Sequence, residues 1–198
     1  MSSGDLFKLI FLIGVIAAEV IRFPHRMRVK QARRQKTATD DRTRPIDFAL
    51  DLAAFAGMEI IPLIYVFWGW PPLADYARPD LLGWLGAIGF AGCLYVLYRA
   101  HVDLGQNWSP TVEVTPTQSL VTSGIYGVIR HPIYAAMWLW GTAQALLLNN
   151  WVAGPATLIL FGIVYFVRVP REEQMMLDHF GEEYRAYMQR TGRVIPKF

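Results

Sequence analysis

The chain has 198 residues, of which 54% are hydrophobic and 18% are charged, with a formal net charge of +3 at neutral pH. This length suits one domain, and so apolar a composition argues against a soluble protein. The single cysteine, Cys93, excludes a disulfide framework and any metal site built from several cysteines.

Five apolar segments follow one another along the chain, at residues 6–23, 46–70, 81–98, 132–148 and 151–167. The third has no charged residue over 18 positions, which as a helix is enough to cross a hydrocarbon core of about 30 Å. The last two are separated by Asn149 and Asn150, as in a helical hairpin. One such segment suits the core of a soluble protein, but five predict an all-α, polytopic membrane protein with about five transmembrane helices.

Lysine and arginine gather in the loop at residues 24–45, whereas residues 71–80 hold Arg78 against two aspartates. By the positive-inside rule, the basic loop, residues 100–131 and the C-terminal tail face the cytoplasm, and the N-terminus lies outside. The loop lacks interleaved aromatic residues that would stack on bases. A lipid-facing loop is therefore favoured over a nucleic-acid site.

The second apolar segment contains one acidic residue, Glu59, that is expected deep within the bilayer. A carboxylate there is costly, so it marks either a functional group or a residue paired with a polar neighbour. The sequence leaves both interpretations open.

The C-terminal residues 169–190 are charged, yet apolar and aromatic residues recur among them at helical spacing: Met176, Leu177, Phe180, Tyr184 and Tyr187. This pattern predicts a cytoplasmic amphipathic helix, with an interruption at Gly181.

Motifs of common soluble active sites are missing from the sequence. There is no GxGxxG loop and no GxSxG elbow, and the four histidines lack the spacing of metal ligands. Polar groups gather instead in two blocks on the predicted cytoplasmic side. These are LVTSGIYGVIRHPIY at residues 120–134 and RVPREE at residues 168–173.

In the first block, Gly124 and Gly127 allow a turn or a close backbone approach. Pro132 suits the first position of a helix, so Arg130 and His131 would stand at its N-terminus, where an anion is favoured.

In the second block, Arg168 and Glu172 are four residues apart and would share one helix face if the helix continues past Pro170. An ordinary surface salt bridge is the plainer interpretation of this pair taken alone.

Together with Asn107-Trp108-Ser109 and with EEQMMLDHFGEEYRAYMQRTGRVIP at residues 172–196, the two blocks resemble the isoprenylcysteine carboxyl methyltransferase family. The likeness covers residues 103–196, about half of the chain. It implies one integral membrane methyltransferase domain over residues 1–198. Residues 1–99 would form three transmembrane helices, and residues 100–198 would bind S-adenosylmethionine between a helical hairpin and the tail.

By position, the resemblance implies that Arg168 and Glu172 are catalytic, with Glu172 meeting the amino group of the cofactor and Arg168 binding the carboxylate of the substrate. The other cofactor-binding residues that it implies are Glu113, Gln118, Leu120, Val121, Gly124, Tyr126, Arg130, His131, Pro132, Ile133 and Tyr134. Gln118 departs from the histidine that many relatives carry. No metal ion is implied.

Methyl transfer from a sulfonium is an in-line displacement, so the implied task of the protein is to align the reactants. The implied acceptor is lipidic, enters from the bilayer and bears a carboxylate, as a prenylated cysteine does. Three alternatives stay open: a lipid amine or thiol as acceptor, a relative of NADPH-dependent sterol-type reductases, and a non-catalytic membrane scaffold.

Overall fold

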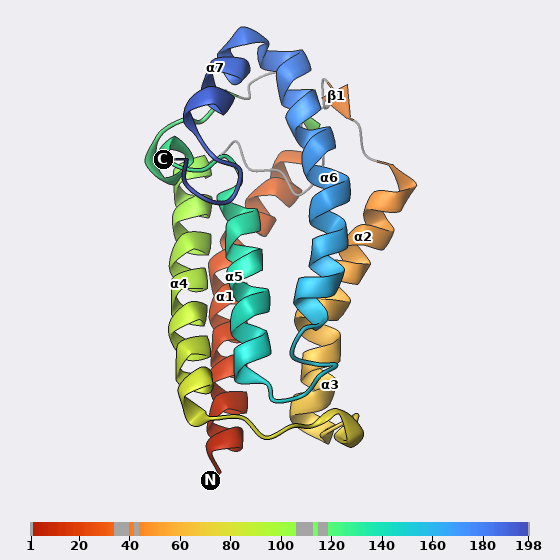
Figure 1. Ribbon diagram of the computed structural model, residues 1–198. Coiled ribbons are helices and arrows are strands. Elements are labelled where there is room, and N and C mark those ends of the chain that lie inside the picture. The colour runs from red at the N-terminus through yellow and green to blue at the C-terminus, as the bar shows by residue number, and fades with distance from the viewer. Residues whose placement is uncertain (1, 34–39, 42–43, 106–112, 115–118, 198) are drawn as a thin grey trace.

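The computed structural model describes residues 2–33, 40–41, 44–105, 113–114 and 119–197, which form a bundle of long helices (Figure 1). Its long helices are α1 (Ser3–Arg33), α4 (Asp80–Leu104), α5 (Pro132–Leu147) and α6 (Ala156–Phe180), and the short α7 (Glu182–Arg190) follows α6. Two two-residue strands, β1 (Asp40–Asp41) and β2 (Glu113–Val114), pair antiparallel. Apart from this small pairing, the prediction of an all-α fold is confirmed.

The second apolar segment forms a continuous helical rod of three parts: α2 (Pro45–Phe55), the π-helical turn η1 (Ala56–Ile60) and α3 (Ile61–Trp68). A π-helical turn takes one carbonyl out of the usual helical bonding. Here the carbonyl of Gly57 accepts hydrogen bonds from Gln144 Nε2 at 3.1 Å and Thr157 Oγ1 at 2.8 Å. Side chains of α5 and α6 therefore supply hydrogen-bond donors to the backbone carbonyl of the π-helical turn.

Helix α1 continues through Pro24 to Arg33, which corrects the boundary expected at residue 24 and makes the beginning of the basic loop helical. A proline removes one backbone hydrogen bond from a helix. One ion pair spans the proline, since Glu19 binds Arg26 at 2.8 Å, and Glu19 also binds Arg22 on the preceding turn at 3.1 Å.

The turn between α5 and α6 occupies residues 148–155, more than the two asparagines of the predicted hairpin. Asn150 organises it, because its Oδ1 accepts the backbone N–H groups of Val152 at 3.0 Å and Ala153 at 2.9 Å. The last apolar helix therefore begins at Ala156, five residues later than the apolar segment itself.

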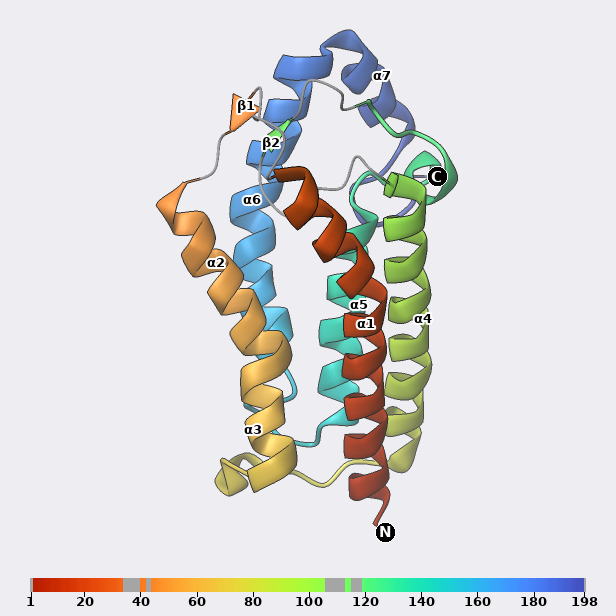
Figure 2. The ribbon, with the colours of Figure 1, turned by 180° about the vertical axis from the view of Figure 1, so that it is seen from behind.

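Each helix of the bundle packs against its neighbours, so that the helices are connected from α1 to α2 by successive contacts (Figure 2). Helix α4 contacts α1 and α5, α5 contacts α6, and α6 contacts α2 and η1. Large side chains fill its centre, where Phe90 lies 4.9 Å from Trp140 and 5.9 Å from Phe11 between ring centroids. This core joins the two halves of the chain and holds the beginning of α5 beside the later part of α6.

In the described residues, two helices are long and apolar enough to cross a membrane, Pro45–Trp68 and Asp80–Leu104. Most of each is unburied within the bundle, and large apolar side chains such as Phe67, Trp68 and Ile88 point outward. Such a surface suits a lipid environment, and the chain is an integral membrane protein. That α1, α5 and α6 also cross the membrane stays a prediction.

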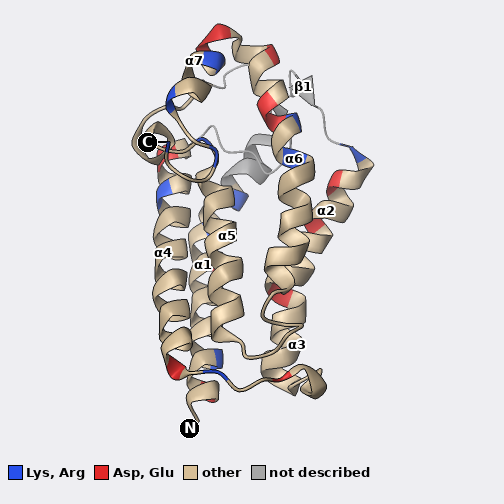
Figure 3. Cartoon of the chain, viewed as in Figure 1, with Lys and Arg blue, Asp and Glu red and all other residues tan. Residues whose placement is uncertain are grey.

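The two ends of the bundle differ in what they carry. The C-terminal ends of α1, α4 and α6, the beginnings of α2 and α5, and all of α7 lie at one end, called the α7 end below (Figure 1). The N-terminus and the connections α3–α4 and α5–α6 lie at the other. Charged residues concentrate toward the two ends, with a largely uncharged stretch between them (Figure 3). The three segments predicted to share one side of the membrane thus meet at the α7 end.

Candidate functional site

The beginning of α5 is a corner held by the C-terminal segment. Pro132 is the first residue of α5, as predicted, and His131 precedes it in a non-helical conformation. The backbone N–H of His131 donates to the carbonyl of Arg193, and that of Arg130 to Gly192, both at 2.8 Å. The residues after α7 therefore fix how the chain enters α5.

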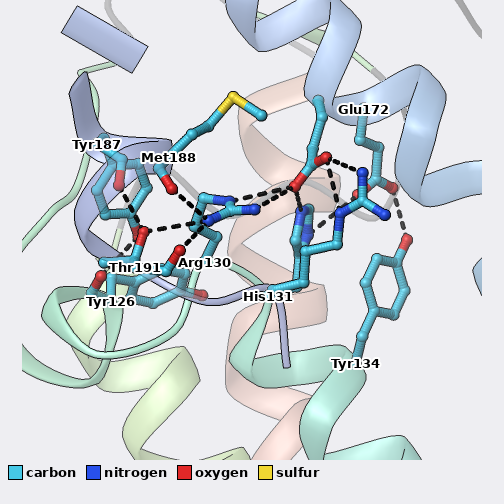
Figure 4. A network of polar contacts seen from close by, with 10 residues as sticks. Tyr126, Arg130, His131, Tyr134, Glu172, Tyr187, Met188 and Thr191 are labelled. Carbon is cyan, nitrogen blue, oxygen red and sulfur yellow. Dashed lines mark hydrogen bonds and ion pairs between the residues drawn. The ribbon is translucent and has the colours of Figure 1, made fainter. Parts of the chain in front are cut away.

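Glu173 is the centre of an ion-pair cluster at this corner, formed with Arg193 and with Arg130, which is labelled in Figure 4. Arg130 donates to its Oε1 from Nε at 3.2 Å and from Nη2 at 3.1 Å, and Arg193 donates to its Oε2 at 2.9 and 2.6 Å. The side chain of Glu173 is 4% exposed. Burial alone would raise the pKa of this carboxyl, but His131, Arg193 and Arg130 outweigh it and lower the pKa to about 2.

Arg130 also binds the segment that follows α7. Its Nη1 donates to the carbonyls of Met188, at 3.2 Å, and Thr191. The guanidinium is thus directed at Glu173 and at backbone carbonyls of the tail. This placement gives Arg130 a positioning role, and direct contact with a cofactor stays a prediction.

Glu172, the neighbour of Glu173, has a different environment. Its Oε1 accepts the hydroxyl of Tyr134 at 2.6 Å, and its Oε2 lies 3.8 Å from His131 Nδ1. The side chain is 23% exposed, and burial raises the pKa of its carboxyl despite these neighbours. Because it is bound by a neutral phenol rather than by two guanidinium groups, Glu172 keeps the capacity to bind a cation.

Arg168 lies one turn before Glu172, because α6 continues past Pro170 as the spacing required. Its direct ion pair is not with Glu172. Nη2 donates to Asp51 Oδ1 of α2 at 2.8 Å and to the Asp47 carbonyl at 3.3 Å. The residue is 7% exposed, and its Nε is buried with no acceptor among the residues that the structure describes. Arg168 is therefore a buried guanidinium whose Nε–H group can still bind an acceptor.

The stretch before the corner is tied to it by hydrogen bonds. Leu120 and Val121 are half-buried and precede the 3-10 turn η4 (Gly124–Gly127). Gly124 has a φ of 59° and sits against Asp103, whose Oδ2 accepts the Ile125 N–H at 2.8 Å. A side chain at Gly124 would collide with that carboxylate, so the glycine is required for the turn.

Tyr126 is buried in the same turn and is linked to Arg130 through a chain of bonds (Figure 4). Tyr187 donates to the Tyr126 carbonyl at 2.6 Å, Thr191 Oγ1 donates to the Tyr187 carbonyl at 2.6 Å, and Arg130 binds Thr191. Helix α7 thus connects the turn to the corner.

Most of the predicted site residues are brought together. The side chains of Arg130, His131, Tyr134 and Glu172 are in mutual or shared contact, with Pro132 and Ile133 in the same first turn of α5. The predicted cofactor contacts of Glu113 and Gln118 stay predictions. The backbone of Glu113 lies in β2, and Gln118 lies outside the described residues.

Four residues of the site were not predicted from the sequence: Asp47, Asp51, Glu173 and Arg193. The pair of adjacent glutamates was a signal for Glu173, since neighbouring residues on a helix point about 100° apart and one of them faces inward. For Asp51 no local signal exists, because 117 residues separate it from Arg168.

Glu59, whose role the sequence left open, lies in the π-helical turn η1. Its charged neighbours are Glu19, Arg22 and Arg26 of α1. Glu59 therefore lies near a like charge and two cations of α1, away from the corner at α5, and a functional role for it stays a prediction.

The fold and the site define a helical integral membrane protein with a polar site at the α7 end, built from the beginning of α5 and the later half of α6. Residues 86–178 match the profile of the isoprenylcysteine carboxyl methyltransferase (ICMT) family. The resemblance stated from the sequence is thereby confirmed over that region, which contains the corner, Arg168 and Glu172.

Individual proteins show the same similarity. Protein-S-isoprenylcysteine O-methyltransferase of Tribolium castaneum is 32% identical over 131 residues, covering 63% of this chain and 47% of that protein. Methanethiol S-methyltransferase 1 of Bradyrhizobium diazoefficiens is 31% identical over 171 residues, covering 78% and 57%. The chain thus spans about half the length of the curated relatives it matches.

A solved structure gives the corresponding result for the fold. The structure described as the eukaryotic intramembrane Ras methyltransferase ICMT superposes with a TM-score of 0.51 and 26% identity. The match covers 78% of this chain and 53% of the other. The helical arrangement is therefore shared well beyond the two sequence blocks.

Proposed function

We propose that this protein transfers a methyl group from S-adenosylmethionine to a lipidic acceptor that bears a carboxylate, the reaction type named for its protein-S-isoprenylcysteine O-methyltransferase relatives. One observation carries the proposal. On successive turns of α6, Glu172 offers a carboxylate suited to a cation, and Arg168 offers a buried N–H suited to an anion. S-adenosylmethionine carries an ammonium group, and the acceptor a carboxylate.

The residues present fit the cofactor. The carboxylate of Glu173 is ion-paired with Arg130 and Arg193, whereas that of Glu172 accepts a hydrogen bond from a neutral hydroxyl and is partly exposed. When bound, S-adenosylmethionine supplies an electrophilic methyl group on a sulfonium. Glu172 would hold its ammonium group. The remaining contacts would come from His131, Pro132, Ile133 and Tyr134 of the corner, from Tyr126, and from the backbone at Leu120, Val121 and Gly124.

Arg168 would bind the acceptor carboxylate and orient one of its oxygens toward the methyl group. Guanidinium groups suit this task because two parallel N–H donors match the two oxygens of a carboxylate. Holding both reactants in alignment is the main catalytic contribution available to a site of this kind. Arg168 lies on α6 at its contact with α2, and both helices expose large apolar side chains. The acceptor would therefore reach Arg168 from the bilayer, among membrane lipids.

The membrane orientation belongs to the same proposal. Soluble S-adenosylmethionine would enter from the cytoplasm, so the α7 end would face the cytoplasm and the N-terminus the outside. The arginines at this end, including Arg44, Arg171 and Arg193, follow the positive-inside rule.

A neutral thiol is the second candidate acceptor. It is favoured by the alignment with methanethiol S-methyltransferase 1, which covers 78% of this chain against 63% for the Tribolium protein. A thiol has no need of a guanidinium partner, so Arg168 distinguishes the two candidates.

The test compares wild type with Arg168→Ala in detergent, using radiolabelled S-adenosylmethionine and the acceptor N-acetyl-S-farnesylcysteine. We expect kcat/KM for the acceptor to fall by about 10- to 100-fold, the loss expected of one hydrogen-bonded ion pair, and the Kd for S-adenosylhomocysteine to stay within about twofold.

An equal loss of both properties would place Arg168 with the cofactor. Methylation of farnesyl thiol but not of the carboxylate acceptor would favour the second candidate. Binding of NADPH in place of S-adenosylhomocysteine would support the reductase alternative and contradict both.

A further inference from the structure

Two aspartate–arginine pairs join α2 to α6 on successive turns. Asp47 binds Arg171 at 2.8 and 3.1 Å, and Asp51 binds Arg168 at 2.8 Å. The pairs have the same chemistry and connect the same two helices. One of them involves the guanidinium to which the acceptor carboxylate is assigned, so the carboxylate already on it requires an explanation.

The Asp47 pair is fixed in place. Its carboxylate is buried, receives both N–H bonds from Arg171 and also accepts the backbone N–H of Arg44 at 2.7 Å. Three donors converge on one buried group at the first turn of α2. This pair therefore links α2 to α6 at the α7 end without any contribution from Asp51.

The Asp51 pair is asymmetric. The side chain of Asp51 is 54% exposed, whereas Arg168 is buried. The single bond between them uses one nitrogen of the guanidinium, Nη2. Because the carboxylate of Asp51 is partly in solvent, it can turn outward once another carboxylate takes its place on the buried guanidinium, which would be costly to leave unpaired. Of the two partners, Asp51 is the one able to leave.

The unmet donor of Arg168 shows what would replace it. Nε is buried without an acceptor in the described part of the chain, and a buried N–H of this kind is costly to leave unpaired. A carboxylate that bound Nε and Nη2 together would satisfy it. Such two-point binding needs Nη2, which Asp51 occupies.

We propose that Asp51 is a specificity-determining residue, whose carboxylate occupies Arg168 until the acceptor carboxylate displaces it. This inference rests on the proposed function. Displacement makes a carboxylate acceptor compete with Asp51, whereas a neutral acceptor leaves the pair intact. Asp51 therefore weakens the binding of anionic acceptors and sets how strongly the enzyme distinguishes them from neutral ones.

The test is Asp51→Asn, assayed with N-acetyl-S-farnesylcysteine and with farnesyl thiol. Removing the competing charge should lower KM for the carboxylate acceptor by about three- to fivefold. This is the change in affinity that corresponds to the free energy of one partly exposed ion pair. We expect kcat, the Kd for S-adenosylhomocysteine and any turnover of farnesyl thiol to change less than about twofold. Asp51→Glu keeps the charge and should not lower KM. Glu183→Gln, an exposed carboxylate on α7, is the matched control for a loss of charge.

A KM for the carboxylate acceptor that is unchanged or raised in Asp51→Asn would overturn the inference. So would equal losses with both acceptors, which would mark Asp51 as a structural link between α2 and α6. Failure of the wild type to methylate the carboxylate acceptor would instead contradict the proposed function. If Asp51→Asn does not fold, a lowered KM in Asp51→Glu is the overturning result.

Discussion

Glu172 and Glu173 are adjacent carboxylates that the fold uses in opposite ways. Glu173 faces the corner at α5 and binds Arg130 and Arg193, so its ionised form is stabilised. Burial raises the pKa of Glu172, so its ionised form lowers the stability of the free protein. A residue that costs stability while retaining its charge for a ligand is typical of a binding site.

Glu173→Gln should lower the free energy of unfolding by about 2–3 kcal/mol, because it leaves the buried guanidinium of Arg130 without its carboxylate and also removes the ion pair with the more exposed Arg193. The pKa of Glu173 is lowered from its ordinary value of 4.5 to about 2. Its contribution is therefore complete above pH 4.5 and is lost as the pH falls toward 2. Thermal unfolding in detergent between pH 2 and 7 measures both effects.

In that experiment, wild type should lose stability over this acidic range more steeply than Glu173→Gln. Glu183→Gln, on the exposed side of α7, should behave like wild type. Parallel pH profiles for wild type and Glu173→Gln would show that the ion pairs do not hold the corner.

At the scale of elements, the π-helical turn η1 is held by a buried polar cluster that crosses three helices. Gln144 of α5 donates to the carbonyls of Gly57 and Ala153, and its Oε1 accepts from Trp140 at 3.1 Å and lies 2.7 Å from the Thr157 hydroxyl oxygen. In an apolar bundle such a cluster specifies which helices pair and in what register. Its position connects α2, and so Asp51, to the helices that carry the site.

Thr157→Val keeps the shape of the side chain but removes its hydroxyl, which lies 2.8 Å from the Gly57 carbonyl. We expect a loss of about 1–2 kcal/mol in stability, because the buried Gly57 carbonyl loses one of its two donors and Gln144 Oε1 loses a polar neighbour. Thr142→Val is the control, since its hydroxyl is exposed and binds the Trp138 carbonyl of its own helix. Chemical denaturation in detergent compares the two, and equal effects would show that the cluster contributes nothing particular.

Local sequence patterns predicted the helices better than the boundaries and irregular turns between them. The apolar segments, Pro132 as the first residue of α5 and the break at Gly181 all follow from signals within a few residues. The continuation of α1 through Pro24 does not, because a proline ordinarily ends or kinks a helix, and the ion pair that spans it joins side chains seven residues apart, Glu19 and Arg26. The π-helical turn likewise depends on donors from other helices, which a pattern along one helix cannot show.

At the scale of the whole molecule, the polar site lies at one end of a bundle whose sides are apolar. The sequence predicted the two blocks and their likeness to a family, because each block is continuous in the chain. The link from Arg168 to Asp51 could not be predicted, since it depends on how α2 packs against α6. The proposed topology places the α7 end and the α3–α4 connection on opposite sides of the membrane.

Labelling of single cysteines tests this arrangement in a Cys93→Ser background, which removes the buried native thiol. Lys197→Cys, at the α7 end, should react with a membrane-impermeant maleimide only from the cytoplasmic side. Leu73→Cys, at a fully exposed position of the α3–α4 connection, should react only from the outside. Labelling of both from one side would contradict the proposed topology.

The most direct test of the proposed site is calorimetric titration of the purified protein with S-adenosylhomocysteine, comparing wild type, Glu172→Gln and Glu183→Gln. Wild type and Glu183→Gln should bind alike. Glu172→Gln should bind at least about tenfold more weakly, because it loses the charge that would pair with the ligand's ammonium group, and should be no less stable. Absence of binding by wild type, or undiminished binding by Glu172→Gln, would contradict a cofactor site at the junction of α5 and α6.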